Sequence, residues 1–266
     1  MIDGSHMNNS KVAVLIDAEN ISPKYAQLML SEAGNFGNVI CKRIYGDWSC
    51  SSLSSWKMPI MEHSINAIQQ FHSASGKNAS DSALIIDAMD LLHEGKYQSI
   101  CIVSSDSDFT KLALRLRESE VYVVGMGEQK TLASFRSACD KFLYLDVLFK
   151  ENSEGKEKPN SEEKDGKQQT IEISDASQGG LNLNTVIATI NEIIDTVSDE
   201  DGWAGLATVG SVLSNKITDF DVRNFGCKKL SQFIKEQGIY EVKADCAESN
   251  PNNKVVYVKR KKTDDP

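Results

Sequence analysis

The sequence predicts two folded domains: an α/β domain with a parallel sheet flanked by helices, and a small winged helix-turn-helix-like α+β domain. Three observations lead to this expectation. Strand and helix patterns alternate through residues 8–150, which favours a parallel sheet covered by helices. Residues 151–180 are rich in Glu, Lys, Ser, Gly and Gln, as expected of a flexible linker. Residues 181–262 show three helical patterns followed by two strand patterns.

The first domain opens with residues 11–17 (KVAVLID), an apolar, β-branched run typical of a strand buried on both faces. Ser22 and Pro23 then predict a helix start, with Ser as N-cap and Pro at the first helical position. Residues 80–93 carry apolar side chains at helical spacing before Gly95, and residues 99–104 (SICIVS) predict another buried strand. Further strands are expected at 39–45, 67–71 and 121–125, and further helices at 56–63, 108–119 and 132–139.

The second domain has amphipathic helical patterns at 183–197, 206–217 and 223–237. Strand patterns follow at 240–243 and 255–259, with the turn-forming residues 250–253 (NPNN) between them. Three helices followed by a hairpin is the winged helix-turn-helix order. We expect the large aromatic side chains of this domain in its core rather than free to stack on bases; they are Trp203, Phe225, Phe233 and Tyr240.

Composition excludes several classes of protein. The 266 residues include 29 Lys+Arg and 38 Asp+Glu, for a net charge of -9. No apolar run reaches the roughly 18 residues of a membrane-spanning helix. The six cysteines form no Cys-x-x-Cys pair, which argues against a zinc knuckle or a disulfide scaffold and favours the reducing cytoplasm. Residues 1–7 (MIDGSHM) look like the remnant of a cleaved tag and are set aside.

Acidic residues stand where the predicted sheet should present its ligand-binding edge. Asp17 ends the first strand, Asp106 and Asp108 follow the SICIVS strand, and Asp81 begins a helix. In an open parallel sheet, ligands bind outside the carboxyl ends of the strands, where the strand order reverses. If the first and fourth strands are neighbours, these carboxylates converge in one crevice.

Carboxylates that share a crevice raise one another's pKa values, and a divalent cation removes that penalty. Oxygen ligands without Cys or His suit Mg²⁺ or Mn²⁺, and such an ion can activate water to attack a phosphodiester. Asn20 can bind the ion or a phosphate, and Ser104, Ser105 and Thr110 can donate hydrogen bonds to the ligand or to the carboxylates. The alternative is that these residues cap helices, for which Asp108 and Asp81 are good candidates. Asp87, on another side of its helix, is expected outside the site.

Three segments of the first domain resemble the NYN domain, a relative of the PIN-domain nucleases. They are LIDAENIS (15–22), KNASDSALIIDAMD (77–90) and IVSSDSDFTKLALRLRESEVYVVGMG (102–127), within a match over about residues 11–145. The resemblance implies a PIN-like parallel α/β sheet and an Mg²⁺- or Mn²⁺-dependent ribonuclease. It also implies that Asp17, Asp81, Asp106 and Asp108 bind the metal beside Asn20, and by analogy that Lys77 contacts a phosphate.

The second domain resembles the OST-HTH domain, also called LOTUS, most specifically in DFDVRNFGCKKLSQFI (219–234). Members of this family bind RNA, and some animal members bind a helicase instead, so the resemblance implies RNA, with structured RNA among the options, or a protein as partner. The basic residues expected on or near the third helix are Arg223, Lys228, Lys229 and Lys235, and the wing ends in residues 259–262 (KRKK). Binding by such a face is expected to be salt-sensitive and directed mainly at the RNA backbone.

The favoured interpretation is a metal-dependent ribonuclease that binds its substrate through the LOTUS domain, in many relative domain geometries because of the linker. The alternative is a non-catalytic RNA-binding or regulatory protein with a PIN-like fold, which the net charge of -3 on residues 8–149 favours. A haloacid-dehalogenase-type phosphatase would need a second Asp two residues after Asp17, where Glu19 stands. The sequence leaves a homodimer open and indicates no membrane partner.

Overall fold

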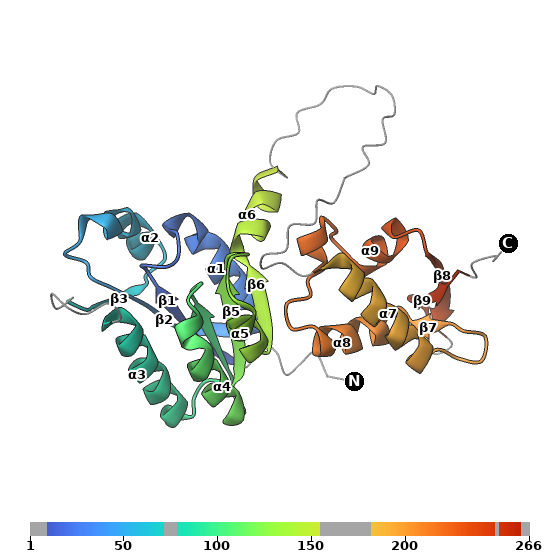
Figure 1. Ribbon diagram of the computed structural model, residues 1–266, viewed down its shortest axis with the longest axis horizontal. Helices are drawn as coiled ribbons and strands as arrows, with labels where there is room; N and C mark the ends of the chain where they lie inside the picture. The colour runs from blue at the N-terminus through green and yellow to red at the C-terminus, as the bar shows by residue number, and fades with distance from the viewer. Residues whose placement is uncertain (1–9, 72–78, 155–181, 248–249, 262–266) are drawn as a thin grey trace, which may run out of the picture.

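The computed structural model describes residues 10–71, 79–154, 182–247 and 250–261. An α/β domain, residues 10–154, is followed by a smaller α+β domain that lies beside the β6 end of the large sheet (Figure 1). None of the helices in the described ranges is long and apolar enough to cross a membrane.

The α/β domain is built on a six-stranded parallel sheet with the order β3-β2-β1-β4-β5-β6. The chain first extends the sheet from β1 to β3, then returns to place β4 on the other side of β1, so the strand order reverses between β1 and β4. The strands are β1 (Lys11–Asp17), β2 (Asn38–Gly46), β3 (Asn66–Gln69), β4 (Ser99–Val103), β5 (Tyr122–Gly127) and β6 (Lys141–Tyr144).

Helices cover both faces of this sheet because alternate strand residues point to opposite faces and both sets are apolar. Val14 and Ile16 of β1 belong to one core cluster, and Ala13 and Leu15 to the other. The helical elements are η2 (Pro23–Tyr25), α1 (Ala26–Ala33), η3 (Gly34–Phe36), η4 (Ser51–Trp56), α2 (Lys57–Glu62), α3 (Ala79–Glu94), η5 (Ser107–Phe109), α4 (Thr110–Glu118), α5 (Ala133–Ala138) and α6 (Leu145–Glu154).

The sequence patterns missed the last strand and helix of this domain, β6 and α6. The four residues of β6 give too short a pattern to stand out, yet they close one edge of the sheet. Helix α6 ends at Glu154, a few residues inside the segment 151–180 that composition assigns to the linker. Ser22 precedes η2 as expected, but its side chain makes no capping hydrogen bond.

The C-terminal domain packs three helices on a three-stranded antiparallel sheet of order β7-β9-β8. The helix expected over 223–237 is two elements, because Gly226 adopts a left-handed conformation (φ 73°) that ends the first of them. The elements are α7 (Leu183–Val197), β7 (Ala204–Gly205), α8 (Leu206–Lys216), η6 (Val222–Phe225), α9 (Leu230–Glu236), β8 (Tyr240–Ala247) and β9 (Asn250–Arg260).

The core of the C-terminal domain holds three of the four aromatic side chains expected there. Phe233 and Tyr240 are buried and Phe225 packs against them. Trp203 is instead half-buried at the sheet, with the ammonium groups of Lys243 and Lys259 4.5 and 5.7 Å from its ring. The expectation of a core position was therefore wrong for Trp203, whose ring is covered by lysine side chains.

The two domains meet along the exposed edge of β6. The backbone N–H of Phe142 donates a hydrogen bond to the carbonyl of Thr218 (3.2 Å), so the segment before η6 continues the edge of the sheet. The Lys141 ammonium donates to the carbonyl of Phe220, and Asp219 accepts from the Tyr144 hydroxyl (2.6 Å). Such cover protects an edge strand from pairing with another chain.

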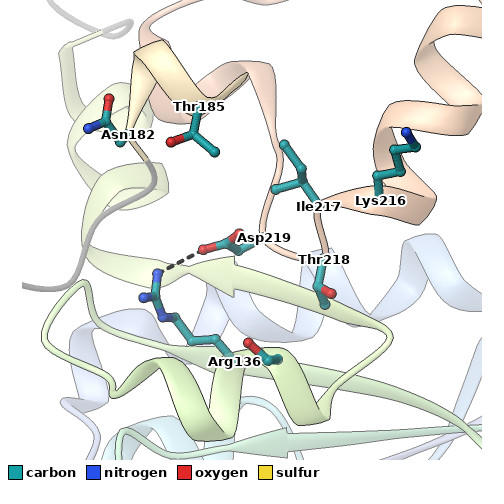
Figure 2. A pocket seen from close by; sticks show the side chains of 8 residues that line it. Arg136, Asn182, Thr185, Lys216, Ile217, Thr218 and Asp219 are labelled. Atoms are coloured by element: carbon teal, nitrogen blue, oxygen red, sulfur yellow. Dashed lines mark hydrogen bonds and ion pairs between the residues drawn. The ribbon is translucent and has the colours of Figure 1, made fainter. Parts of the chain in front are cut away.

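Arg136 of α5 forms an ion pair with Asp219 across this joint (2.8 Å). Figure 2 shows the polar seam around the pair, a cavity of about 390 Å³ to which α5, the first turn of α7 and residues 216–219 contribute. The seam is thus bounded by both domains, which are held together mainly by polar contacts.

Candidate functional site

The candidate site lies where the strand order of the α/β domain reverses. β1 pairs in parallel with β4, so Asp17 at the end of β1 stands beside the residues that follow Val103 at the end of β4. This confirms the expectation that the first and fourth strands are neighbours. The carboxyl ends of the strands at such a reversal are the usual ligand position in parallel sheets, and the place where Asp17, Asp81, Asp106 and Asp108 gather is called the acidic crevice.

Asp17 is almost completely enclosed, with 1% of its surface exposed. Its Oδ2 accepts hydrogen bonds from Asn20 Nδ2 and from Ser104 Oγ, each at 2.7 Å, and its Oδ1 accepts from the backbone N–H of Glu19 at 3.1 Å. Burial raises the pKa of Asp17, and these hydrogen bonds oppose the rise. The carboxylate is therefore held in one orientation by its neighbours.

Asp81 faces the same place from the first turn of α3 and is 8% exposed. Burial raises its pKa to about 6, and the negative charges of Asp17, Asp106, Glu19 and Asp108 contribute further to the rise. Charges raise a pKa in this manner only when they are close. The acidic residues of three separate sequence segments therefore lie near one another in the structure.

Asp106 and Asp108 occupy the turn after β4. Asp106 caps η5, accepting a hydrogen bond from the backbone N–H of Asp108 at 2.9 Å, while its own N–H donates to Ser104 Oγ at 3.0 Å. The sequence favoured Asp108 as the cap, whereas the capping residue is Asp106. The side chain of Asp108 is exposed, whereas Asp106 is half-buried.

The hydroxyl groups around the site have distinct partners. Ser104 is fully buried, and its hydroxyl donates a hydrogen bond to Asp17. Binding a carboxylate was one of the two roles expected for the hydroxyls; the other was binding the ligand. Ser105 Oγ accepts from the backbone N–H of Glu128 (3.0 Å), and Thr110 donates to the carbonyl of Ser107. Ser104 therefore belongs to the site more directly than Ser105 or Thr110. Lys77 lies outside the described residues.

Two further acidic residues of the domain have structural partners. Asp87 of α3 is bound by the Arg43 guanidinium and the Tyr45 hydroxyl, so the fold itself supplies partners for this carboxylate. Asp47, after β2, accepts hydrogen bonds from Ser49 and from Gln69 Nε2. The spacing of six residues along α3 predicts that Asp87 and Asp81 point to different sides of the helix.

A metal ion would find oxygen ligands at this edge but no ready-made coordination sphere. Within the described ranges, no three Asp, Glu, His or Cys side chains are arranged to hold an ion as they stand. The donor set fits a hard cation, since the gathered groups are carboxylates and an amide. Asp17 and Asp106 are each already engaged in hydrogen bonds, so binding an ion would require their side chains to adjust.

The basic residues expected to bind RNA fall into two groups. The guanidinium of Arg223 donates to both carboxylate oxygens of Glu32 on α1 (2.8 and 3.0 Å) and to Asp221. It therefore sits in the joint between the domains. Lys228, Lys229 and Lys235 are exposed at the two ends of α9. Nothing in the sequence indicated that Glu32, 191 residues before Arg223, would be its partner.

Comparison with family models gives the relationship. The model described as the NYN domain matches residues 11–146, just over half of the chain. The chain belongs to the NYN domain family. The OST-HTH/LOTUS domain model matches residues 182–245, so the NYN domain and the LOTUS domain correspond to the two folded units, and the acidic crevice lies in the NYN domain.

Two solved structures are distantly similar to this chain. A protein of unknown function from Vibrio parahaemolyticus is 17% identical, with a TM-score of 0.44, over 52% of this chain and 93% of that one. An uncharacterized protein from Nitrosomonas europaea is 23% identical, with a TM-score of 0.27, over 40% of this chain and 97% of that one. These TM-scores are too low to carry an argument. No curated protein matches the sequence.

Proposed function

We propose that the protein is a metal-dependent ribonuclease whose NYN domain hydrolyses RNA phosphodiesters and whose LOTUS domain binds the substrate. The observation that carries the proposal is the gathering of Asp17, Asp81, Asp106 and Asp108, from the ends of β1 and β4 and the first turn of α3, where the strand order reverses; burial and the neighbouring carboxylates raise the pKa of Asp81 to about 6. A cluster of acids kept close in spite of their repulsion is characteristic of a cation-binding functional site.

Asp17, Asp81, Asp106 and Asp108 are the residues that would hold Mg²⁺ or Mn²⁺, which would supply an activated water and neutralise charge on the phosphodiester. Ser104 and Asn20 position Asp17 through their hydrogen bonds. The exposed side chain of Asp108 stands on the outer side of the crevice, where it can orient an approaching water.

The LOTUS domain contributes the basic groups. Lys228, Lys229 and Lys235 are exposed around α9, and lysines of this kind bind the phosphates of RNA without reading its sequence. Charge reversal at Lys229 and Lys235 should weaken binding equally for all RNA sequences and reduce the dependence of affinity on salt concentration. A variant with unchanged affinity and salt dependence would place the RNA elsewhere.

The deciding experiment is incubation of the full chain with labelled RNAs and Mn²⁺ or Mg²⁺. The Asp17→Asn/Asp106→Asn double variant should lose cleavage by at least about a hundredfold, a magnitude typical of removing charge stabilisation from an active site. Glu118→Gln, an exposed carboxylate at the end of α4, is the matched control and should cleave normally. Mn²⁺ binding, followed by calorimetry, should weaken in the double variant alone.

The second candidate function is RNA binding without cleavage, favoured by the lack of a preformed three-ligand group in the described part of the chain. In that case the wild type would bind RNA but release no product above the level of the double variant with any RNA or either metal. That result would remove the nuclease proposal and leave the binding function.

A further inference from the structure

A second cavity opens next to the acidic crevice of the NYN domain. It measures about 450 Å³ and lies between the segment that follows Asp17 and the 3-10 helix η4. Ala18 and Glu19 line one side of it, and they are the two residues directly after Asp17. The cavity therefore adjoins the chain segment that carries Asp17 of the acidic crevice.

The walls of the cavity are held in place by the fold. The backbone N–H of Ala18 donates to the carbonyl of Tyr45 (3.0 Å), and the indole N–H of Trp56 donates to the carbonyl of Ala18 (3.2 Å). At the end of β2, a Cβ on Gly46 would lie 2.7 Å from Leu53 Cδ1 and 3.2 Å from Ala18 Cβ. A larger residue at this position would displace the Leu53 side chain that lines the cavity, so the shape of the cavity depends on specific packing.

The lining suits an uncharged, flat group with polar edges. Ile21, Leu53 and Trp56 give it apolar walls, and Ser52 and Ser55 add hydroxyl groups that can donate or accept hydrogen bonds. None of the described residues that line it is a Lys, Arg or His, and Glu19 is acidic. A phosphate would be repelled here, whereas a nucleobase matches the mixture of apolar and hydroxyl groups.

We infer that this cavity is a nucleobase subsite that takes the base next to the phosphodiester held in the acidic crevice. Its volume lies within the roughly 300–1,000 Å³ of pockets that bind small ligands. A base can enter only when it is unstacked and splayed from its neighbours, as in single-stranded RNA. The inference rests on the proposed function and assigns the position at which one base of the RNA would bind.

The test uses the full chain with Ser55→Phe and, as a matched control, Ser54→Phe. Both serines are exposed on η4, but only Ser55 lines the cavity. The two variants therefore place the same bulky side chain on the same helix, and only Ser55→Phe blocks the cavity. Single-stranded RNAs of one sequence, each with one abasic position, are assayed for affinity without metal and for cleavage with Mn²⁺. In the wild type and in Ser54→Phe, one abasic position should lower affinity or cleavage by about tenfold, as expected for losing contacts in an apolar pocket.

The affinity and cleavage rate of Ser55→Phe with intact RNA should be about as low as those of the wild type with that abasic RNA. Ser55→Phe should no longer distinguish intact RNA from abasic RNA. Equal behaviour of Ser55→Phe and Ser54→Phe on every RNA, or tighter binding of duplex than of single strands, would overturn the inference. Absence of cleavage by the wild type would overturn the nuclease proposal alone, since the affinity measurements still decide the subsite. Absence of RNA binding would overturn both.

Cys50 provides an independent block that does not change the sequence near the cavity. It lines the rim and is exposed, whereas Cys41, Cys101, Cys139 and Cys227 are buried. Alkylation of the wild type with a bulky maleimide should reproduce the Ser55→Phe result. Cys50→Ser, treated in the same way, should keep its discrimination against the abasic RNA, and loss of discrimination there would contradict the assignment.

Discussion

Two clusters of acidic side chains in this protein differ in what neutralises them. In the crevice of the NYN domain, burial raises the pKa values of Asp17 and Asp81. At the joint with the LOTUS domain, burial alone would raise the pKa of Asp221, but hydrogen bonds and charge from Arg223 lower it below its usual value. Similar carboxylates thus have opposite pKa shifts.

The difference separates an acidic cluster that supports the fold from one that serves a ligand. At the joint, Arg223 binds Glu32 and Asp221 together, and Arg136 binds Asp219, so the chain supplies the positive charge itself. At the crevice, burial raises the pKa of Asp81, and repulsion from four neighbouring carboxylates raises it further. Repulsion of that kind destabilises the protein, and a bound cation would relieve it.

The largest expected effect is at the joint. Glu32→Ala leaves the Arg223 guanidinium, two-thirds buried, with Asp221 as its remaining partner, and should weaken docking of the domains by about 3 kcal/mol. Hydrogen exchange at the Phe142 N–H and the solution radius by X-ray scattering should both increase. Glu192→Ala, which breaks the exposed pair with Lys216, is the control and should change neither. An unchanged Phe142 exchange rate in Glu32→Ala would show that the ion pair does not hold the joint.

The next effect has the opposite sign. Asp81→Asn removes one of the crowded charges and should stabilise the metal-free protein at neutral pH by about 2 kcal/mol, because the pKa of Asp81 is raised to about 6. Urea unfolding at pH 7 measures the difference. Destabilisation by this change would mean that Asp81 holds the fold together, and would remove the contrast with the joint.

The two acidic clusters should contribute to stability with opposite dependences on pH. The pKa of Asp81 is higher in the folded state than its usual 3.8, so its contribution to stability grows as the pH falls from about 6 to 4 and is lost as the pH rises again. The pKa of Asp221 is lowered, so its contribution is present at neutral pH and is lost as the pH falls through about 3.8 and below. Unfolding of the wild type and Asp81→Asn should accordingly converge towards pH 4; a constant difference between them would contradict the assignment.

The smallest effect concerns the hydroxyl beneath the crevice. Ser104→Ala removes the donor to Asp17 and the acceptor of the Asp106 N–H, and should cost about 1 kcal/mol in urea unfolding. Ser54→Ala, at an exposed position of η4, should be neutral. If both changes were neutral, the network from Ser104 would not be what orients Asp17.

The crevice could be predicted largely from the sequence, whereas the joint could not. Asp17 and Asp106 were found because Asp17 ends one buried strand and Asp106 comes shortly after another, and parallel strands end at one edge of the sheet. Ser104 was one of several hydroxyls with the same local signal, and only the packing shows that it is the one that binds Asp17. A large aromatic side chain such as that of Trp203 is typical of a core, but its place beside Lys243 follows from strand pairing.

Local patterns were also insufficient where an element is short. β6 has four residues, fewer than a periodic pattern needs, and it becomes a strand because β5 and residue 218 offer hydrogen-bonding partners on its two sides. The basic residue Arg223 looked like an RNA contact from its neighbours in the sequence. Its bond to Glu32 exists because two distant segments come together when the domains dock.

By itself, the amino-acid sequence determined the alternation of strands and helices, the two-domain order and the set of acids at the strand ends, since these follow from periodicity and from residues near one another in the chain. Only the tertiary structure decided which carboxylates meet an arginine and which meet one another. The physical reason is that charges interact through space: Glu32 and Arg223 are 191 residues apart in the chain, yet the guanidinium of one rests on the carboxylate of the other.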